Sequence, residues 1–157
     1  MSKNCAIEER LKELNVTLPG KREVLASYTP AVRVGNFLYL SGQDCSVNGE
    51  FLHKGKLGKE FTVKEGQQFS KQCMINALQV IKDYGGGLSN VKQIVKMLAW
   101  VSSAEDFNDQ PFVVNGASDF LEEVFGKRGK HARSAIGTNE LPLNIPVEIE
   151  LVVELKK

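Results

Sequence analysis

The chain is poor in the residues that build metal and redox sites. Its 157 residues include three cysteines and two histidines, and no two cysteines form a C-x-x-C pair. A zinc ribbon and a thioredoxin-type redox pair are therefore excluded, and we expect reduced thiols at Cys5, Cys45 and Cys73. His53 and His131 alone are too few for a histidine-rich metal site.

Long apolar runs and an excess of one charge are also missing. No segment approaches the roughly 20 apolar residues that span a membrane, and the charged N-terminus lacks the apolar centre of a signal peptide. The formal net charge of +1 does not mark a dedicated nucleic-acid or membrane-surface protein. With 42% hydrophobic and 25% charged residues, we expect an ordinary cytoplasmic globular protein.

The N-terminal third predicts one short helix followed by a β-hairpin. Residues 6–14 place apolar side chains at helical spacing, and a polar connector continues to about Ser27. Residues 31–34 and 37–41 are rich in Val, Leu and aromatic side chains, which favour strands. Gly35-Asn36 between them suits a tight hairpin turn, because both residue types tolerate a positive φ.

The longest helix is expected to begin at Thr62. Thr62 and Glu65 form the pattern of a capping box, in which each side chain bonds the backbone amide of the other residue. Apolar residues then recur on one helical face up to Ile81. Gly85-Gly86-Gly87 fits a helix C-cap. It does not fit a phosphate loop, because no Lys-Ser or Lys-Thr follows and no strand precedes it.

The C-terminal half predicts a strand, a helix and a second strand. β-Branched and aromatic residues cluster from about Ile94, and Ser102-Ser103 ends that strand. A helix covers residues 118–126 and begins at some point between Pro111 and Ser118. Residues 145–155 alternate between apolar and mostly polar side chains, which is typical of a strand with one buried face.

The order after Ala31 is therefore β-β-α-β-α-β, as in a ferredoxin-like fold. We expect an α+β domain in which a mixed sheet carries all its helices on one face. The first strands are apolar on both sides, and Val152 interrupts the glutamates of the last strand. A sheet face with this apolar character needs a cover, which favours oligomerisation through it.

One cation and two carboxylates stand close together near the C-terminus. Arg133 precedes the turn at Leu141-Pro142, and Glu148 and Glu150 follow on one face of the last strand. A guanidinium grips a carboxylate in a planar two-point fork that lysine cannot reproduce. A glutamate nearby can position water or carry a proton. The pattern predicts a site for a small organic acid.

Each of these residues also has a purely structural interpretation. Arg133 can form a salt bridge with Glu148 or Glu150 inside an oligomer, and Glu148 can be one more polar residue on a solvated strand face. Tyr28 can be an aromatic side chain of an interface. Gly42 is first of all a turn residue.

Several short motifs occur in a fixed order between Tyr28 and Leu155. They are Val34-Gly35-Asn36, Leu40-Ser41-Gly42-Gln43, Val114-Asn115, Arg133-Ser134, Leu141-Pro142 and Val147-Glu148-Ile149-Glu150. With these motifs the chain resembles the RidA/YjgF family of reactive-intermediate deaminases, also labelled endoribonuclease L-PSP. Residues 1–27 look like the N-terminal extension of a longer subfamily, and residues 28–157 like the family domain.

The resemblance implies a chorismate-mutase-like subunit that forms homotrimers. In such trimers the sheets pack into a central barrel, and the sites lie in clefts between neighbouring subunits. Family members hydrolyse 2-imino acids, or their enamine tautomers, to 2-oxo acids and ammonia without a metal or an organic cofactor. The expected partners are therefore small 2-imino and 2-oxo carboxylates rather than a membrane or a nucleic acid.

The resemblance also implies roles for particular residues. Arg133 would hold the substrate carboxylate, and Glu148 would position the attacking water. Tyr28 would form a wall of the pocket, and the backbone at Ser41-Gly42 would meet the reacting end of the substrate. Asn115 would border the cleft from across an interface.

Three positions depart from the family pattern. Ala135 stands two residues after the arginine, where many members have a cysteine that contacts the substrate. Pro30 stands where glutamine is common, and additional chain around Gln110-Pro111 can reshape the mouth of the cleft. These departures leave the arginine in place and bear on which substrate side chain is accepted.

Two other functions compete with imine hydrolysis. The basic residues 127–131 suggest RNA binding or cleavage, but no aromatic side chains are interleaved with them and no histidine pair suits attack on a phosphodiester. The second alternative is a non-catalytic trimer that binds small carboxylates, since Arg133 would serve either purpose.

Overall fold

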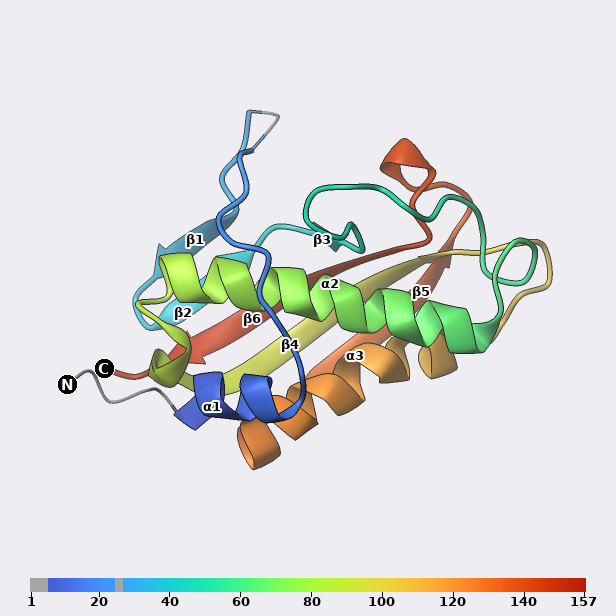
Figure 1. Ribbon diagram of the computed structural model, residues 1–157. Helices are drawn as coiled ribbons and strands as arrows, with labels where there is room; N and C mark the ends of the chain where they lie inside the picture. The colour runs from blue at the N-terminus through green and yellow to red at the C-terminus, as the bar shows by residue number, and fades with distance from the viewer. Residues whose placement is uncertain (1–5, 25–26) are drawn as a thin grey trace.

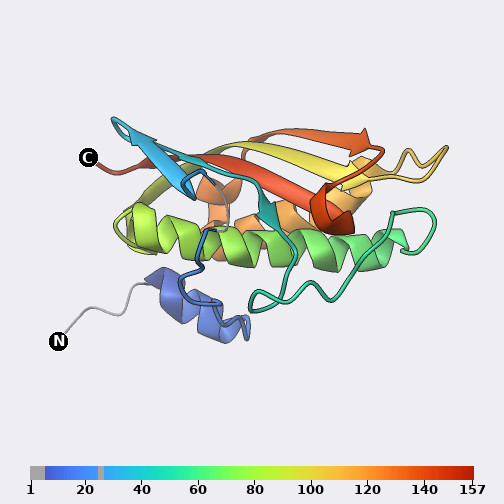
Figure 2. The same cartoon turned by 90° about the horizontal axis from the view of Figure 1, so that it is seen from above.

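One mixed β-sheet organises the chain, and the three described α-helices all lie on the same side of it, α2 and α3 against the sheet and α1 outside them, against α3 (Figures 1 and 2). The structure is a computed structural model that describes residues 6–24 and 27–157. The helices are α1 (Ala6–Glu13), α2 (Val63–Tyr84) and α3 (Gln110–Phe125). The strands are β1 (Ala31–Val34), β2 (Phe37–Leu40), β3 (Gln43–Asp44), β4 (Val91–Ser102), β5 (Ala132–Thr138) and β6 (Val147–Leu155). Three short 3-10 helices are η1 (Leu88–Asn90), η2 (Gly126–Gly129) and η3 (Pro142–Asn144).

The strand order is β1-β2-β6-β4-β5, and β3 pairs with β6 beyond the end of β2. Among the described strands, β4 and β5 are the one parallel pair, and α3 is the crossover between them. The predicted α+β class with helices on one face is confirmed. The predicted order β-β-α-β-α-β is wrong, because it omits β5 and the short β3. Strand β5 lies at the sheet edge and has only one large apolar side chain, Ile136, so its sequence carries no apolar alternation.

The predicted ends of α2 are confirmed. The Thr62 hydroxyl accepts from the Glu65 amide at 3.3 Å, and the Glu65 carboxylate accepts from the Thr62 amide at 2.8 Å. At the other end the Gly87 amide donates to the Lys82 carbonyl at 3.1 Å, while Gly86 and Gly87 both adopt positive φ. This closes the helix as glycine-rich C-termini do.

Helix α3 begins at Gln110, so the additional chain around Pro111 is its first turn. Proline suits this position because its missing amide hydrogen has no partner in a first turn. Gly116, which lowers helix propensity, allows α3 to approach α2 closely. A Cβ atom at Gly116 would overlap the backbone of Gln67.

The described part of the N-terminal extension packs on the same core as the rest of the chain. Ile7 and Leu11 of α1 are buried, and Arg10 Nε donates to the Glu123 carbonyl of α3 at 2.9 Å. The chain then crosses beside α2 towards β1 (Figure 1). On this path the Gly20 amide donates to the Gln79 side chain at 3.2 Å.

The face of the sheet away from the helices, here called the open face, is bare in the described chain (Figure 2). In β2 the buried Leu38 and Leu40 alternate with side chains that point to this face. Five large apolar side chains on it are 39–61% exposed, namely Val32, Val34, Phe37, Tyr39 and Ile136. Such a surface is what a further protein layer would cover.

Cys45 and Cys73 are unpaired and buried, whereas Cys5 lies outside the described residues. Among the described helices, none is both long and apolar enough to cross a membrane.

Candidate functional site

Arg133 lies on the edge strand β5 and reaches towards α3. Its register partner on β4 is Met97, which is fully buried, so Arg133 projects from the helix-covered side of the sheet. Its Nη1 donates to the Asn115 side-chain oxygen at 2.9 Å and to the Ser118 hydroxyl at 3.0 Å. Its Nη2 donates to the Pro111 carbonyl at 3.3 Å. Three groups of one helix therefore fix the plane of the guanidinium.

The guanidinium retains two donors for a ligand. Arginine has five N–H groups, and Asn115, Ser118 and Pro111 accept three of those of Arg133. In the described chain the N–H of Nε and one N–H of Nη2 have no partner, and Arg133 forms no ion pair. A hollow of about 340 Å³ adjoins the side chain, with walls that include Lys130 and His131. Two donors on one guanidinium suit the two oxygens of a carboxylate.

Ser118 connects Arg133 to His131. The His131 Nδ1 is 2.6 Å from the Gly129 carbonyl, which can only accept, so Nδ1 carries the proton. In the neutral ring Nε2 then accepts from the Ser118 hydroxyl, 3.0 Å away. Burial lowers the pKa of His131, as does the charge of Arg133, although the bond to Gly129 opposes them. The neutral ring thus orients a hydroxyl that accepts from Arg133.

Glu148 projects from the open face. Its register partner on β4 is Trp100, whereas the register partner of Arg133 is Met97. Met97 and Trp100 are three positions apart on β4, so their side chains point to opposite faces of the sheet. Glu148 is half-buried between Val147 and Ile149, which are fully buried. Its carboxylate lies against Gly42, where an added Cβ atom would overlap it.

The surroundings of Glu148 favour its protonated form. Burial raises the pKa of its carboxyl, and the negative charges of Asp44 and Glu150 raise it further. In the described chain no hydrogen bond or ion pair holds this carboxylate. A carboxyl that keeps its proton to higher pH than an ordinary glutamate is better suited to act as an acid.

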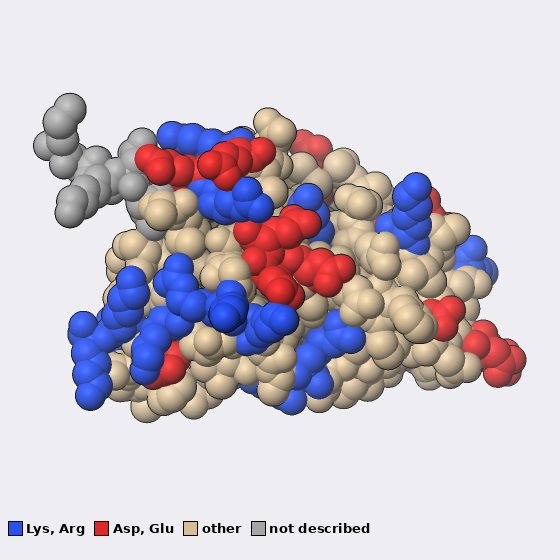
Figure 3. Space-filling model, turned by 90° about the horizontal axis from the view of Figure 1, so that it is seen from below, with Lys and Arg blue, Asp and Glu red and all other residues tan. Residues whose placement is uncertain are grey.

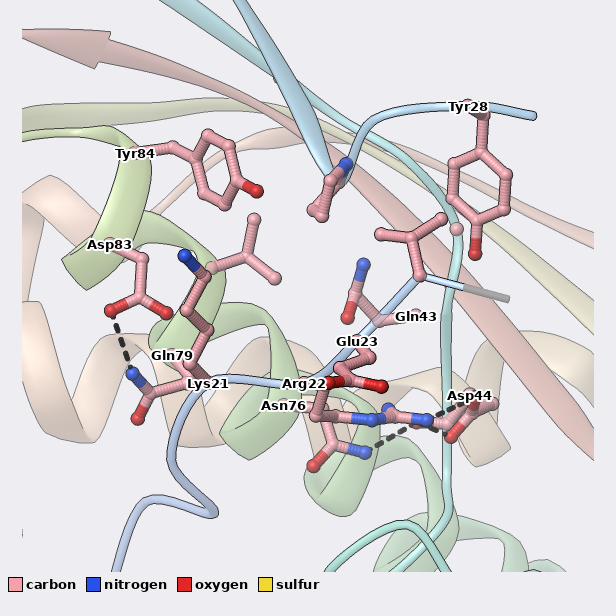
Figure 4. A pocket seen from close by; sticks show the side chains of 14 residues that line it. Lys21, Arg22, Glu23, Tyr28, Gln43, Asp44, Asn76, Gln79, Asp83 and Tyr84 are labelled. Carbon is pink, nitrogen blue, oxygen red and sulfur yellow. Dashed lines mark hydrogen bonds and ion pairs between the residues drawn. The ribbon is translucent and has the colours of Figure 1, made fainter. Parts of the chain in front are cut away.

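Tyr28 and Gly42 line a cavity of about 70 Å³ between the N-terminal segment, β3 and α2 (Figure 4). Tyr28 is 58% exposed and stands at the side of this cavity. Ser41 does not line it. The Ser41 hydroxyl donates to the Thr29 carbonyl at 2.7 Å, and its amide donates to the Pro30 carbonyl at 2.9 Å. Ser41 therefore ties the segment before β1 to the end of β2.

The predicted site residues fall into two groups within one chain. Arg133 and Asn115 are in contact, and Ala135 follows Arg133 on the same side of β5. Glu148 and Gly42 are in contact on the other side of the sheet. Asn115, expected to reach the cleft from across an interface, lies beside the Arg133 of its own chain, because α3 leads directly into β5.

Four further residues contribute to these groups and are not singled out by sequence patterns. Ser118 and His131 belong to the Arg133 group. Asp44 is the register partner of Glu148, and Arg22 donates to the Asp44 carboxylate at 3.3 and 3.2 Å. Ser118 follows Asn115 by three residues, so the two share a helix face. His131 precedes Arg133 by two residues, and residues at this spacing along a strand point to the same side of the sheet. These two spacings are the sequence signals that connect Ser118 and His131 with the site. No spacing links Arg22 with Asp44.

The basic residues 127–131 do not form a free row of cations. The Arg128 guanidinium donates to the Val91 carbonyl at 2.8 Å, and Lys130 pairs with Glu122 at 3.4 Å. On the side of the molecule that carries α1 and α3, basic side chains lie next to a group of acidic ones (Figure 3). A phosphate backbone would meet both charges there.

Comparison with known proteins identifies the class to which this fold and site belong. The family model described as "YjgF/chorismate_mutase-like, putative endoribonuclease" matches residues 8–155. The chain therefore belongs to the YjgF/chorismate-mutase-like family, which confirms the resemblance in its motifs. The match includes most of residues 1–27, the segment expected to be an N-terminal extension.

Three relatives align with nearly the whole chain. Protein TCP17 of Trypanosoma cruzi is 35% identical over 150 residues, which are 95% of this chain and 94% of that protein. A 2-iminobutanoate/2-iminopropanoate deaminase of Dermatophagoides farinae is 30% identical over 142 residues, 90% of this chain and 95% of the deaminase. A crystal structure of an Agrobacterium tumefaciens protein of unknown function is 38% identical, with a TM-score of 0.88 over 96% of this chain and 92% of that one.

Proposed function

We propose that this protein hydrolyses small 2-imino or 2-enamino acids to 2-oxo acids and ammonia. The observation that carries the proposal is the state of Arg133. Its guanidinium is held by Asn115, Ser118 and Pro111, retains two N–H donors and adjoins an open hollow. The name of the deaminase relative supports imino acids as the class of carboxylate.

The site is proposed to need two copies of the chain. Arg133 and Glu148 of one chain lie on opposite sides of the sheet, so one copy cannot bring both to a small substrate. The exposed apolar side chains of the open face support an assembly that covers it. A homotrimer places the Arg133 group of one subunit beside the Glu148 group of the next, once at each interface.

The chemistry requires orientation and proton transfer. Arg133 binds the carboxylate, which sets the C=N carbon beside Glu148. Water adds to that carbon, and the nitrogen takes up a proton, giving a carbinolamine. The C–N bond then breaks as the nitrogen leaves as ammonia and the hydroxyl loses its proton. Glu148 gives and takes back these protons, a role that its raised pKa suits.

The other predicted residues shape the cleft. Gly42 leaves the room that the Glu148 carboxylate occupies. Tyr28 forms a wall, and Asn115 acts through its bond to Arg133. Ala135 offers only a methyl group beside the arginine, so this subsite discriminates by size and not by a thiol contact. Hydrolysis in the cytoplasm would remove these reactive acids where they form.

The decisive experiment generates imines with an amino-acid oxidase and follows their disappearance with and without the protein. Wild type accelerates the loss of the imine. We expect R133K to lose about 10- to 100-fold in kcat/KM, because a point charge does not reproduce a charged two-point contact. R128K is the matched control, since Arg128 bonds a backbone carbonyl outside the hollow. Wild-type kcat/KM in R133K contradicts the proposal.

The spare donors of Arg133 would equally serve a carboxylate-binding protein without activity. That alternative predicts no acceleration with any imine, together with 2-oxo acids bound at Arg133 in soaked crystals. The raised pKa of Glu148 supports hydrolysis, because proton transfer to the leaving nitrogen needs a group that holds a proton.

A further inference from the structure

Asp44 is the most strongly held carboxylate around Glu148. Arg22, from the N-terminal segment, donates from Nη1 and Nη2 to its two oxygens at 3.3 and 3.2 Å (Figure 4). The Ser46 amide donates to Oδ1 at 2.9 Å, and the Ser46 hydroxyl donates to the same oxygen. Four donors therefore stabilise its ionised form. Although burial opposes ionisation, these bonds and the charge of Arg22 together lower the pKa of Asp44.

Asp44 and Glu148 are direct neighbours across two strands. They are register partners in the β3–β6 ladder, where side chains project to the same side with Cβ atoms about 5 Å apart. In contrast to Asp44, Glu148 receives no donor from the described chain. Gly42 bounds its carboxylate on one side.

Two carboxyl groups this close do not ionise independently. When one carries a negative charge, the other holds its proton to higher pH, and the environment decides which one does so. Here the donors all belong to Asp44. The proton of the pair therefore resides on Glu148, and the opposite pKa shifts of the two groups agree with this division.

We infer that Arg22, through its fork to Asp44, is a positioning residue that makes Glu148 the proton carrier of the active site. This deepens the proposed function and rests on it. The protonated Glu148 gives its proton to the nitrogen as water adds to the C=N carbon, and the resulting carboxylate takes the proton that the water oxygen loses. Glu148 then gives this proton to the nitrogen, which leaves as ammonia, and takes the proton of the hydroxyl as the C=O bond forms, so each turnover restores the acid. The N-terminal extension thereby takes part in the chemistry without touching the substrate.

The other titratable groups near Glu148 do not share this arrangement. Glu150, on the same strand, is exposed and raises the pKa of Glu148 less than Asp44 does. From α2 the nearby group is the Cys73 thiol, whose pKa burial raises, so it stays neutral. On β4 the partner is Trp100, which does not titrate. Asp44 is the neighbour whose charge Arg22 controls.

The test is a carboxyl titration of Glu148 by NMR in protein labelled with ¹³C at glutamate side chains, with E148Q to assign the signal. We expect a wild-type midpoint above the ordinary glutamate value. D44N removes the negative neighbour and moves the midpoint down. R22M removes the fork that keeps Asp44 ionised, so the midpoint of Asp44, followed with ¹³C at aspartate side chains and assigned with D44N, moves up towards that of Glu148. R10M, which loses the exposed pair of Arg10 with Glu13, leaves both midpoints unchanged.

A lower Glu148 midpoint in D44N and a higher Asp44 midpoint in R22M, with neither moved in R10M, support the inference. A wild-type Glu148 midpoint at the ordinary glutamate value overturns it, as does an Asp44 midpoint that R22M leaves unchanged. If D44N does not fold, R22M decides alone, since Arg22 lies on a surface segment.

The pH profile of imine hydrolysis separates this inference from the proposed function. The rate of an enzyme that needs protonated Glu148 falls as pH rises through the Glu148 midpoint. That alkaline limb should move down in D44N, along with the NMR midpoint of Glu148. Shifted midpoints without any imine hydrolysis would refute the function and leave the Asp44–Glu148 pair standing. If the protein hydrolyses imines but the alkaline limb of its pH profile does not follow the NMR midpoint of Glu148, only the proton-carrier role is refuted.

Discussion

Arg133 and Glu148 of one chain point away from each other, through opposite faces of the same sheet. Their partners on β4, Met97 and Trp100, are three residues apart, an odd number, and no register shift lies between them. Strand alternation therefore fixes the separation, and side-chain rotation cannot undo it. A site that uses both residues has to be shared between copies.

The hydrogen bonds of Arg133 predict the effect of S118A. This change removes one of the two acceptors of Nη1 and leaves the guanidinium freer to rotate. We expect the dissociation constant for 2-oxobutanoate to rise about fivefold, as the loss of one hydrogen bond of about 1 kcal/mol implies. Calorimetric titration measures it. S89A is the control, because Ser89 is an exposed residue of η1. Equal affinity in S118A and wild type would contradict the support role.

The state of His131 predicts how stability depends on pH. Its pKa is lowered in the folded protein, so between that value and the ordinary value of about 6.5 the unfolded chain binds more protons. This contribution to the free energy of unfolding is complete above about pH 6.5 and is lost as the pH falls.

H131Q tests this directly, because glutamine offers an acceptor to Ser118 and does not titrate. Thermal melts between about pH 5 and pH 7.5 should show that wild type loses more stability on acidification than H131Q does. Parallel curves for the two proteins would mean that His131 titrates as it does in the unfolded chain.

The contact between Gly42 and Glu148 predicts that G42A is harmful. The φ of Gly42 does not require glycine, but an added methyl group would overlap the Glu148 carboxylate. We expect the carboxylate to shift, with a loss of about 1–3 kcal/mol in the free energy of unfolding and a clear fall in kcat/KM. G20A is the comparison, since Gly20 has a positive φ but nothing within 4 Å. It should lose stability through backbone strain and keep its kcat/KM.

Local rules sufficed for much of the fold. The capping box at Thr62 and the glycine-rich C-terminus of α2 are determined by residues next to each other, and so is the hairpin turn at Gly35-Asn36. Strand β5 could not be found in this way. Its pairing with β4 depends on a neighbour far along the chain, and an edge strand needs no apolar alternation.

The same distinction applies to the site. Arg133 and Glu148 stand out by residue type and position, but their orientation relative to the sheet follows only from the register of β4. The fork between Arg22 and Asp44 joins a segment before β1 to β3, and no sequence period connects them. These features depend on packing between segments far apart in the sequence, which local sequence patterns do not report.

The most direct test of a shared site mixes two defective proteins. R133K and E148Q are each expected to be nearly inactive in imine hydrolysis, since every interface lacks one of the two groups. After dissociation and joint reassembly, random mixing gives roughly a quarter of the interfaces an intact Arg133 from one subunit and an intact Glu148 from the next.

We therefore predict that the mixture regains roughly a quarter of wild-type activity, while each variant carried alone through the same treatment regains none. A mixture as inactive as its components, with size-exclusion chromatography and mass spectrometry showing mixed assemblies, would contradict a site built from two chains.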